Sequence, residues 1–250
     1  YISCPEAISM RTLFLALLLL APSAYALDGA EVLTRIEEKM WPDSYAMHRI
    51  LINTNRDGSE RVYAMFTLKK GRDKIVNLFL QPEEEHGRVL LRVGGSMWLK
   101  LPDVNRPLRV SSVHSVVSGL FNNWDLMISN FSSDYAVQSA KEEEDAYVLT
   151  LKAKNDWVIY DTLEMRAGKE DFLLRKVEAF TTAGMLLKTV TYRTIKDFGD
   201  GIVRPSVVET ESPLWPRVKV VMLFGEIRKK QLSDEVFTVD YMSKVADLNL

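Results

Sequence analysis

Alternating apolar and polar positions predict that the chain consists mainly of β-strands from Tyr45 onward. Pairs such as Asp57-Gly58 and Asp200-Gly201 separate the alternating runs, and such pairs favour tight turns between antiparallel strands. The pattern predicts about eleven strands in an up-and-down order. Their expected bounds are 45–53, 60–69, 74–80, 88–93, 96–101, 146–153, 157–166, 171–180, 185–196, 202–211 and 217–228.

Helical spacing of apolar residues occurs in two places. Residues 28–40 begin with Asp28, a favoured N-cap, and carry Glu31 three positions later, which together have the pattern of a capping box. Trp41-Pro42 ends this short helix, because proline cannot continue it. Residues 113–131 place apolar side chains at steps of three and four, which predicts an amphipathic helix kinked near Gly119.

The second helix interrupts the meander between the fifth and sixth strands. A meandering antiparallel sheet with one such insertion is typical of a curved or incompletely closed barrel that a helix plugs or lids. The predicted fold class is therefore mainly β, an unclosed antiparallel barrel of about eleven strands with a helical lid.

Several predicted strands are apolar on both faces, whereas one face of a solitary antiparallel sheet is usually polar. In residues 74–80, Ile75 and Phe79 point to one face while Val76, Leu78 and Leu80 point to the other. Two interpretations remain open at this point. Either the sheet is covered on both sides by other parts of the chain, or one face lines an apolar cavity.

The first 26 residues have the pattern of a secretory signal peptide. Met10-Arg11 precedes the apolar run 13–21, and Ala24-Tyr25-Ala26 supplies the small residues of a cleavage site before Leu27. The run is shorter than the roughly 20 residues that a membrane-spanning helix needs. Residues 1–9 are interpreted as an upstream extension of the reading frame.

Residues 27–250 are then expected to form a single mature domain, because no Pro-, Gly- or Ser-rich linker and no repeat divides them. Cys4 is the only cysteine and lies before the apolar run, so the mature chain would carry neither a disulfide nor a cysteine for acylation. A soluble protein of the periplasm fits this pattern.

Charge and motifs narrow the classes of function. The net charge of −2 and the lack of a basic block argue against a nucleic-acid-binding surface. His48, His86 and His114 do not have metal-ligand spacing, and the sequence contains no nucleophile elbow, phosphate loop or dinucleotide fingerprint. The sequence therefore predicts a protein that is not an enzyme and that holds neither a metal nor a cofactor.

One stretch resembles a known family. The segment 87–102 contains Met97-Trp98-Leu99-Lys100-Leu101-Pro102, and the sequel contains Arg106-Pro107-Leu108-Arg109-Val110 and the residues 119–125. In this order they resemble the outer-membrane lipoprotein-sorting proteins of the LolA/LolB-like superfamily, over nearly the whole mature chain. The resemblance implies an eleven-strand unclosed barrel lidded by helices. It also implies a role in carrying lipoprotein acyl chains between membranes, or in sensing such ligands.

The missing cysteine at the mature N-terminus resembles the soluble carrier of that superfamily rather than its membrane-anchored acceptor. The carriers use an arginine on an early strand to hold the lid, and Arg49 is the candidate counterpart. Deformable methionines suit a lipid cavity. The residues expected to line the cavity or form the lid are Met47, Met65, Met97, Trp98, Leu120, Phe121, Trp124 and Met127, with Met165 and Met222 as further candidates for the lining.

For each of these residues the alternative is an ordinary place in the core. Four arginines near the motif could meet a lipid headgroup or a membrane, but solvated side chains are the favoured interpretation. These are Arg88, Arg92, Arg106 and Arg109.

The leading hypothesis is a monomeric periplasmic carrier that shields acyl chains and delivers them towards the outer membrane. Its expected partners are lipoprotein acyl chains or other lipids, an inner-membrane transporter and an outer-membrane acceptor. The alternative is an accessory or sensor that binds a membrane transporter or an envelope-stress partner through the same cavity. A third class, a hydrolase, would need a pocket where carboxylates and a histidine converge.

Overall fold

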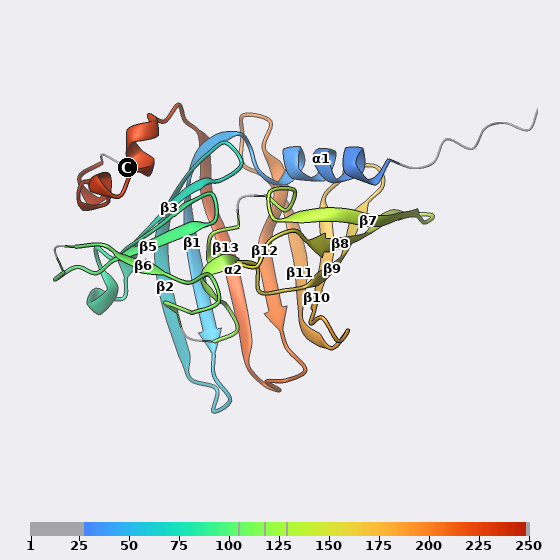
Figure 1. Cartoon of the computed structure of the whole chain (residues 1–250), viewed down its shortest axis with the longest axis horizontal. Helices are drawn as coiled ribbons and strands as arrows, with labels where there is room; N and C mark the ends of the chain where they lie inside the picture. The colour runs from blue at the N-terminus through green and yellow to red at the C-terminus, as the bar shows by residue number, and fades with distance from the viewer. Residues whose placement is uncertain (1–27, 105, 118, 129, 249–250) are drawn as a thin grey trace, which may run out of the picture.

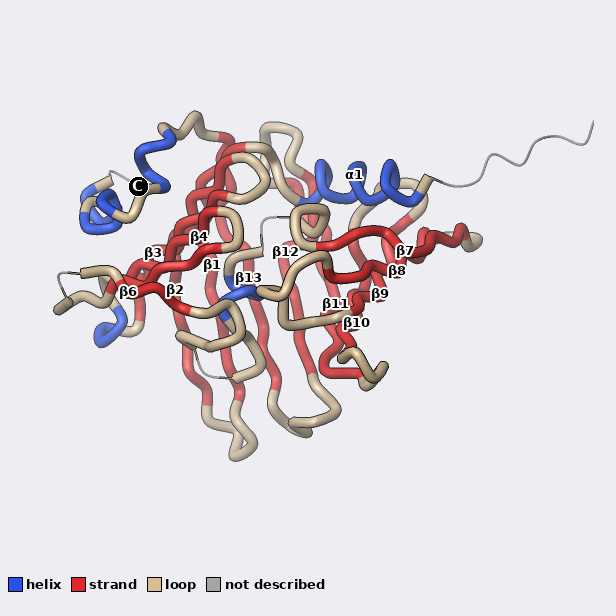
Figure 2. The backbone as a smooth tube through the Cα atoms, viewed as in Figure 1, coloured by secondary structure: helices blue, strands red, loops and turns tan. Residues whose placement is uncertain are grey.

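A computed structural model describes residues 28–248 except 105, 118 and 129. The expected signal peptide, its cleavage site and Cys4 lie outside the described residues. The described chain folds into one antiparallel sheet of thirteen strands, which curves without closing (Figures 1 and 2). The predicted fold class, mainly β and an unclosed antiparallel barrel, is confirmed.

The strands are β1 (Ser44–Thr54), β2 (Glu60–Lys70), β3 (Lys74–Gln81), β4 (Val89–Val93), β5 (Ser96–Lys100), β6 (Leu108–Val110), β7 (Tyr135–Glu142), β8 (Ala146–Ala153), β9 (Thr162–Gly168), β10 (Leu174–Phe180), β11 (Leu186–Asp197), β12 (Val203–Glu211) and β13 (Lys219–Lys229). The helices are α1 (Gly29–Met40) and α2 (Asn123–Leu126), and the 3₁₀ turns are η1 (Glu83–Glu85), η2 (Asp234–Phe237), η3 (Asp240–Ser243) and η4 (Val245–Asp247).

The strand order explains where the chain must cross the sheet. The order is β6-β5-β4-β3-β2-β1-β13-β12-β11-β10-β9-β8-β7, so two meanders meet where β1 pairs with β13. Strands β6 and β7 follow each other in sequence but lie at opposite edges. The connection between them, residues 111–134, therefore crosses the sheet, and α2 marks its middle in front of the strands in Figure 1. We call the described residues of this connection, 111–117, 119–128 and 130–134, the lid segment.

Helix α1 begins where the sequence predicted. The Asp28 side chain accepts hydrogen bonds from the backbone N–H groups of Ala30 at 2.9 Å and Glu31 at 3.3 Å, and Trp41 caps the other end. The helix packs closely against the sheet at its start, because a Cβ on Gly29 would lie 2.7 Å from Val137 Cγ1 of β7. The apolar face of α1 thus joins the main core.

Two apolar cores explain the strands that are apolar on both faces. Ile75 and Phe79 belong to the core on the concave side, which also contains the lid segment. Val76 and Leu78 belong to a second core on the convex side, where Val236 and other residues of the C-terminal 3₁₀ turns cover them. Both interpretations of the pattern hold, because one face is covered by the chain's own turns and the other contains a cavity.

The sheet has two strands more than the eleven predicted. All eleven predicted strands are present, and the additional ones are β6 and β7 at the two edges. Strand β6 has three residues, and most side chains of β7 are exposed or half-buried, so neither carries a clear apolar alternation. Strand β9 begins at Thr162 rather than at 157.

The predicted helix over residues 113–131 is wrong. Within the described part of that range the structure has one helical turn, α2, and otherwise turns and bends. The side chain of Asn123 accepts from the Val116 backbone N–H at 3.1 Å and donates to the Ser111 carbonyl at 2.8 Å. Gly119 has a φ of 92°, which lies outside the helical region. Side chains that bind backbone groups locally compete with helix formation, so the apolar spacing of the segment reflects burial of an irregular chain.

Candidate functional site

A small cavity lies between the lid segment and the concave face of the sheet. Its volume is about 80 Å³. Strands β1, β3 and β9–β13 supply most of its wall, Trp41 at the end of α1 supplies one side, and the lid segment closes it. The apolar wall residues include Met47, Ile75, Val177, Val190, Val208 and Met222.

The lid segment covers the cavity mainly with aromatic rings. Phe121, Trp124, Ile128 and Phe131 all contribute to the lining. The Trp124 ring lies edge-on to the Tyr160 ring, with centroids 5.6 Å apart, and to the Tyr135 ring at 5.8 Å. Edge-to-face pairs of this kind add about 0.5–1.5 kcal/mol each to the apolar burial.

Two side chains of the sheet bind the backbone of the lid. Arg49 of β1 donates from Nη1 and Nη2 to the Leu126 carbonyl, both at 3.2 Å, and Asn77 Nδ2 of β3 donates to the same carbonyl at 3.1 Å. Asn77 Oδ1 accepts from Arg49 Nη2 at 2.5 Å and from Thr67 Oγ1 at 2.7 Å, which fixes its orientation. Burial lowers the pKa of Arg49 to about 10, so the guanidinium is charged at neutral pH.

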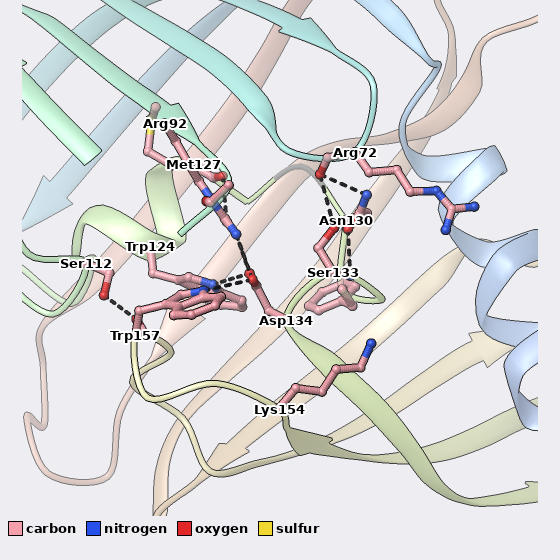
Figure 3. A network of polar contacts seen from close by, with 12 residues as sticks. Arg72, Arg92, Ser112, Trp124, Met127, Asn130, Ser133, Asp134, Lys154 and Trp157 are labelled. Atoms are coloured by element: carbon pink, nitrogen blue, oxygen red, sulfur yellow. Dashed lines mark hydrogen bonds and ion pairs between the residues drawn. The ribbon is translucent and has the colours of Figure 1, made fainter. Parts of the chain in front are cut away.

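A second group anchors the C-terminal end of the lid segment (Figure 3). Arg92 of β4 binds both carboxylate oxygens of Asp134 at 2.7 and 2.8 Å, and both side chains are 1% exposed. The indole Nε1 atoms of Trp124 and Trp157 donate to the same carboxylate at 2.7 and 3.2 Å. Arg92 also donates to the Met127 carbonyl at 3.3 Å. One buried ion pair therefore ties the lid segment to the opposite meander and fixes two tryptophans.

A third group connects the lid segment to β11. Asp125 forms a buried ion pair with Lys188, and the Tyr160 hydroxyl lies 3.0 Å from Asp125 Oδ2. Burial lowers the pKa of Lys188, although Asp125 opposes that shift, and burial together with Asp125 raises the pKa of Tyr160. Asn122 donates to the Tyr160 hydroxyl at 2.8 Å and caps α2.

The structure brings some of the predicted site residues together and separates others. Met47, Phe121 and Trp124 line the cavity, as does Arg49. Met65, Met97 and Met127 are buried in the surrounding concave core without lining the cavity, and Leu120 is half-buried against that core. Trp98 packs on the convex side, against the second core. Of the further candidates, Met222 lines the cavity and Met165 does not.

The expectation that the arginines near the motif are solvated holds for Arg106 and Arg109, which are exposed. It is wrong for Arg92, which is buried in the ion pair with Asp134. Arg88 is largely buried too, and it donates to the Val116 carbonyl of the lid segment at 2.6 Å. Both side chains point to the concave face, where the lid segment supplies acceptors that the local sequence does not reveal.

Sequence reasoning missed several polar residues of the cavity, of which Arg204 is the most buried at 1% exposure. A signal for it existed, because Arg204 lies two residues after the buried Ile202, which directly precedes β12, and four before the buried Val208. Lys188 and Asp125 were missed as well.

Carboxylates and histidines do not converge in the described lining of the cavity. Its described lining contains one carboxylate, Asp125, and no histidine, and His48, His86 and His114 are exposed. Among the described residues, no group of three His, Cys, Asp or Glu side chains could hold a metal ion. No described helix has the length and apolar character needed to cross a bilayer.

The structure is thus an open antiparallel sheet that curves around a small cavity beneath a covering segment. A family model described as "Uncharacterized protein" matches residues 71–244. The chain belongs to this family and, by its fold, to the LolA-like superfamily. No curated protein matches the sequence significantly.

Solved structures agree with this assignment. A LolA superfamily protein from Nitrosomonas europaea is 25% identical, with a TM-score of 0.76 over 85% of this chain and 98% of that chain. A DUF1329 family protein from Desulfovibrio piger is 19% identical, with a TM-score of 0.73 over 85% of this chain and 96% of that one. A domain from Vibrio parahaemolyticus, described as outer membrane lipoprotein-sorting, is 19% identical, with a TM-score of 0.69 over 85% of this chain and 97% of its own.

Proposed function

We propose that this protein is a periplasmic carrier that shields the acyl chains of lipoproteins or other lipids and delivers them towards the outer membrane. The observation that carries the proposal is an apolar cavity whose cover is attached by a small number of polar contacts. The superfamily membership and the lipoprotein-sorting description of the Vibrio domain support the same role. In this proposal residues 1–26 are the signal peptide and residues 27–250 form the carrier domain.

The volume of the cavity requires the lid to move. About 80 Å³ is roughly half of the ~150 Å³ apolar cavity that accommodates one benzene molecule. An acyl chain therefore enters only where Phe121, Trp124 and Phe131 now lie. In this proposal the closed lid and the ligand compete for the same apolar wall.

This competition suits a carrier that has no energy source of its own. Burying ten methylenes contributes about 8 kcal/mol, which alone would hold a lipid too firmly for rapid release. When the ligand leaves, the lid rings bury the same wall again and recover part of that free energy. Ligand release into a membrane or a partner then becomes nearly isoenergetic.

The polar contacts of the lid set the balance between the closed lid and the open, ligand-bound one. The bonds from Arg49 and Asn77 hold the Leu126 carbonyl in the position described, and in this proposal they break when the lid opens. Arg49 therefore acts in this proposal as the residue that holds the lid, the role that its superfamily resemblance implies. The proposed partners are an inner-membrane transporter that loads the carrier and an outer-membrane acceptor that unloads it, with the carrier itself a monomer.

The decisive experiment is native mass spectrometry with lipid extraction, on protein purified from a periplasm without detergent. We expect a fraction of the protein to carry diacyl lipid or a lipoprotein. A protein that is empty, that fails to take up a fluorescent fatty acid and that retains a stable protein partner would contradict the carrier. That result would favour the accessory or sensor that binds a transporter or an envelope-stress partner.

A pair of tryptophan variants tests the role of the lid. Trp124 lines the cavity on the lid side, whereas Trp98 packs on the convex side of the sheet. Trp124→Ala should lose about 3–5 kcal/mol of stability, and Trp98→Ala, which removes a half-buried ring, should also lose stability, but less. Only Trp124→Ala should bind the fluorescent fatty acid more tightly, because it weakens the closed lid. An unchanged affinity in Trp124→Ala would rule out the competing lid.

A further inference from the structure

The charges around the cavity are unbalanced. Among the described residues, its lining contains three cationic side chains, Arg49, Lys188 and Arg204, and one carboxylate, Asp125. Asp125 is paired with Lys188. Arg49 and Arg204 are 5% and 1% exposed, and among the described residues neither forms an ion pair with a carboxylate. Buried guanidinium groups are normally paired with an anion, because desolvation of an isolated charge is costly.

Neutral groups satisfy these two guanidinium groups only in part. Arg49 donates to Asn77 and to the Leu126 carbonyl, while Arg204 donates to the Met40 carbonyl and to Tyr45. The Nε–H groups of both arginines are buried and have no hydrogen-bond acceptor among the described residues. The two side chains thus keep unused donors at the wall of the cavity.

The sheet places the two arginines around one aromatic ring. Phe224 of β13 pairs in register with Arg49 of β1, and the guanidinium carbon of Arg204 lies 4.5 Å from the centre of the Phe224 ring. Strand β13 separates β1 from β12, so both arginines lie where the two meanders join. Burial lowers the pKa of Arg204, as it does for Arg49, and the repulsion between the two guanidinium groups contributes to the shift of Arg49.

We propose that Arg49 and Arg204 form an oxyanion subsite in the cavity, so that the carrier selects lipids whose acyl chain ends in a carboxylate or phosphate group. The inference rests on the proposed carrier function and specifies its ligand class. The oxyanion accepts hydrogen bonds from both guanidinium groups, and the acyl chain lies along Met47, Val208 and Met222. Charge-assisted bonds of this kind are short and strong.

The same subsite would couple binding to opening of the lid. Arg49 uses two of its N–H donors on the Leu126 carbonyl in the closed state. An oxyanion is a stronger acceptor than a carbonyl, so it displaces the lid backbone from Arg49 when it arrives. A neutral lipid lacks that group and has to displace the lid through apolar contacts alone.

Two matched ligand pairs test the proposal on the wild-type protein, by displacement of the neutral dye N-phenyl-1-naphthylamine. The carboxylate pair is palmitate and methyl palmitate, and the phosphate pair is palmitoyl lysophosphatidate and monopalmitoylglycerol. We expect the anionic member of at least one pair to bind roughly 10- to 100-fold more tightly than its neutral partner, since hydrogen bonds to charged groups are the stronger ones. The pair that shows the larger ratio identifies the headgroup.

Variants then show which side chain produces the preference for anionic lipids. Arg204→Gln should reduce the anionic preference to less than about threefold, and Arg204→Lys should retain part of it, because a charge remains. Arg193→Gln is the control, since Arg193 lies on the neighbouring strand β11, is exposed and is paired with Glu209. If Arg204→Gln does not fold, the wild-type pairs still decide the question.

Two results would overturn the proposal in different ways. Equal binding of both members of each pair would refute the oxyanion subsite and leave the lipid carrier standing, with Arg204 serving only to hold the end of α1. Failure of all four lipids to bind, with the dye unaffected, would refute the carrier and the subsite together.

Discussion

The ion pair between Arg92 and Asp134 allows the sharpest test of how the lid segment is anchored. The proposed change is Asp134→Asn, which keeps the shape of the side chain but removes its charge. In the native protein the carboxylate accepts four hydrogen bonds, two from Arg92 and one each from Trp124 and Trp157. The amide that replaces one oxygen is itself a donor, so at least one of these N–H groups would face another donor.

The expected loss of stability follows from burial. Both partners of the ion pair are 1% exposed, so water cannot replace the missing charge beside Arg92. Removing one partner of such a pair typically costs about 3–5 kcal/mol. Since a domain is stable by about 5–15 kcal/mol in total, the variant should lose about a fifth or more of its stability.

Urea unfolding followed by tryptophan fluorescence measures this loss, because two of the reporting rings bind the mutated side chain. Asp161→Asn is the control, since its ion pair with Lys152 is half-exposed and should be worth less than about 1 kcal/mol. The double variant Arg92→Met/Asp134→Leu should recover part of the stability, because it leaves no unpaired charge, although the Trp124 indole N–H loses its acceptor. A loss below about 1 kcal/mol for Asp134→Asn, or a double variant no more stable than the single one, would refute this reasoning.

Three further predictions concern the lid and the buried cations. Arg49→Met should raise the affinity for the neutral dye by about tenfold, because the lid loses part of its attachment; an unchanged affinity in dye titration would exclude that role. Gly119→Ala should destabilise the protein by about 1–3 kcal/mol in urea unfolding, because the φ of 92° disfavours a side chain and the new Cβ would lie 3.0 Å from Asn53. Burial lowers the pKa of Lys69 to about 8 in the folded protein. Between pH 8 and 10.5 the unfolded chain therefore binds more protons than the folded protein does. The free energy of unfolding should rise over that interval by up to about 3 kcal/mol. The Lys69→Met variant should lack this rise, and parallel pH profiles for the two proteins would disprove it.

Most strands of the sheet could be predicted because the pattern that indicates a strand lies within a short stretch of sequence. Each of the eleven predicted strands has its own alternation, and turns such as Asp57-Gly58 mark the ends. The sequence pattern did not predict strands β6 and β7, because these edge strands bury little apolar surface. In the lid segment the apolar pattern was clear, but the helix that it predicts is wrong. The segment buries residues at nearly helical spacing, but Ser and Asn side chains bind its backbone and keep it irregular.

The site was only partly visible in the sequence. Arg49 follows Met47 and precedes Leu51 at two-residue spacing, so its inward direction could be derived from the alternation. The alternation of Ile202, Arg204 and Val208 carries the same signal for Arg204. The partner of Arg92 could not be derived, because Asp134 reaches it only after the chain has crossed the whole sheet.

Polar attachment of the lid has a consequence that apolar packing alone would not produce. Apolar contacts are not directional, so a lid held only by them could shift gradually and leave a lipid partly exposed. The bonds to the Leu126 and Met127 carbonyls and to the Asp134 carboxylate have narrow geometries, and they break together when the segment moves. The lid should therefore have two distinct positions, one in which the rings fill the cavity and one in which the ligand does. In that arrangement a single oxyanion at Arg49 can bias the whole segment, because it competes for the donors that hold the centre of the lid.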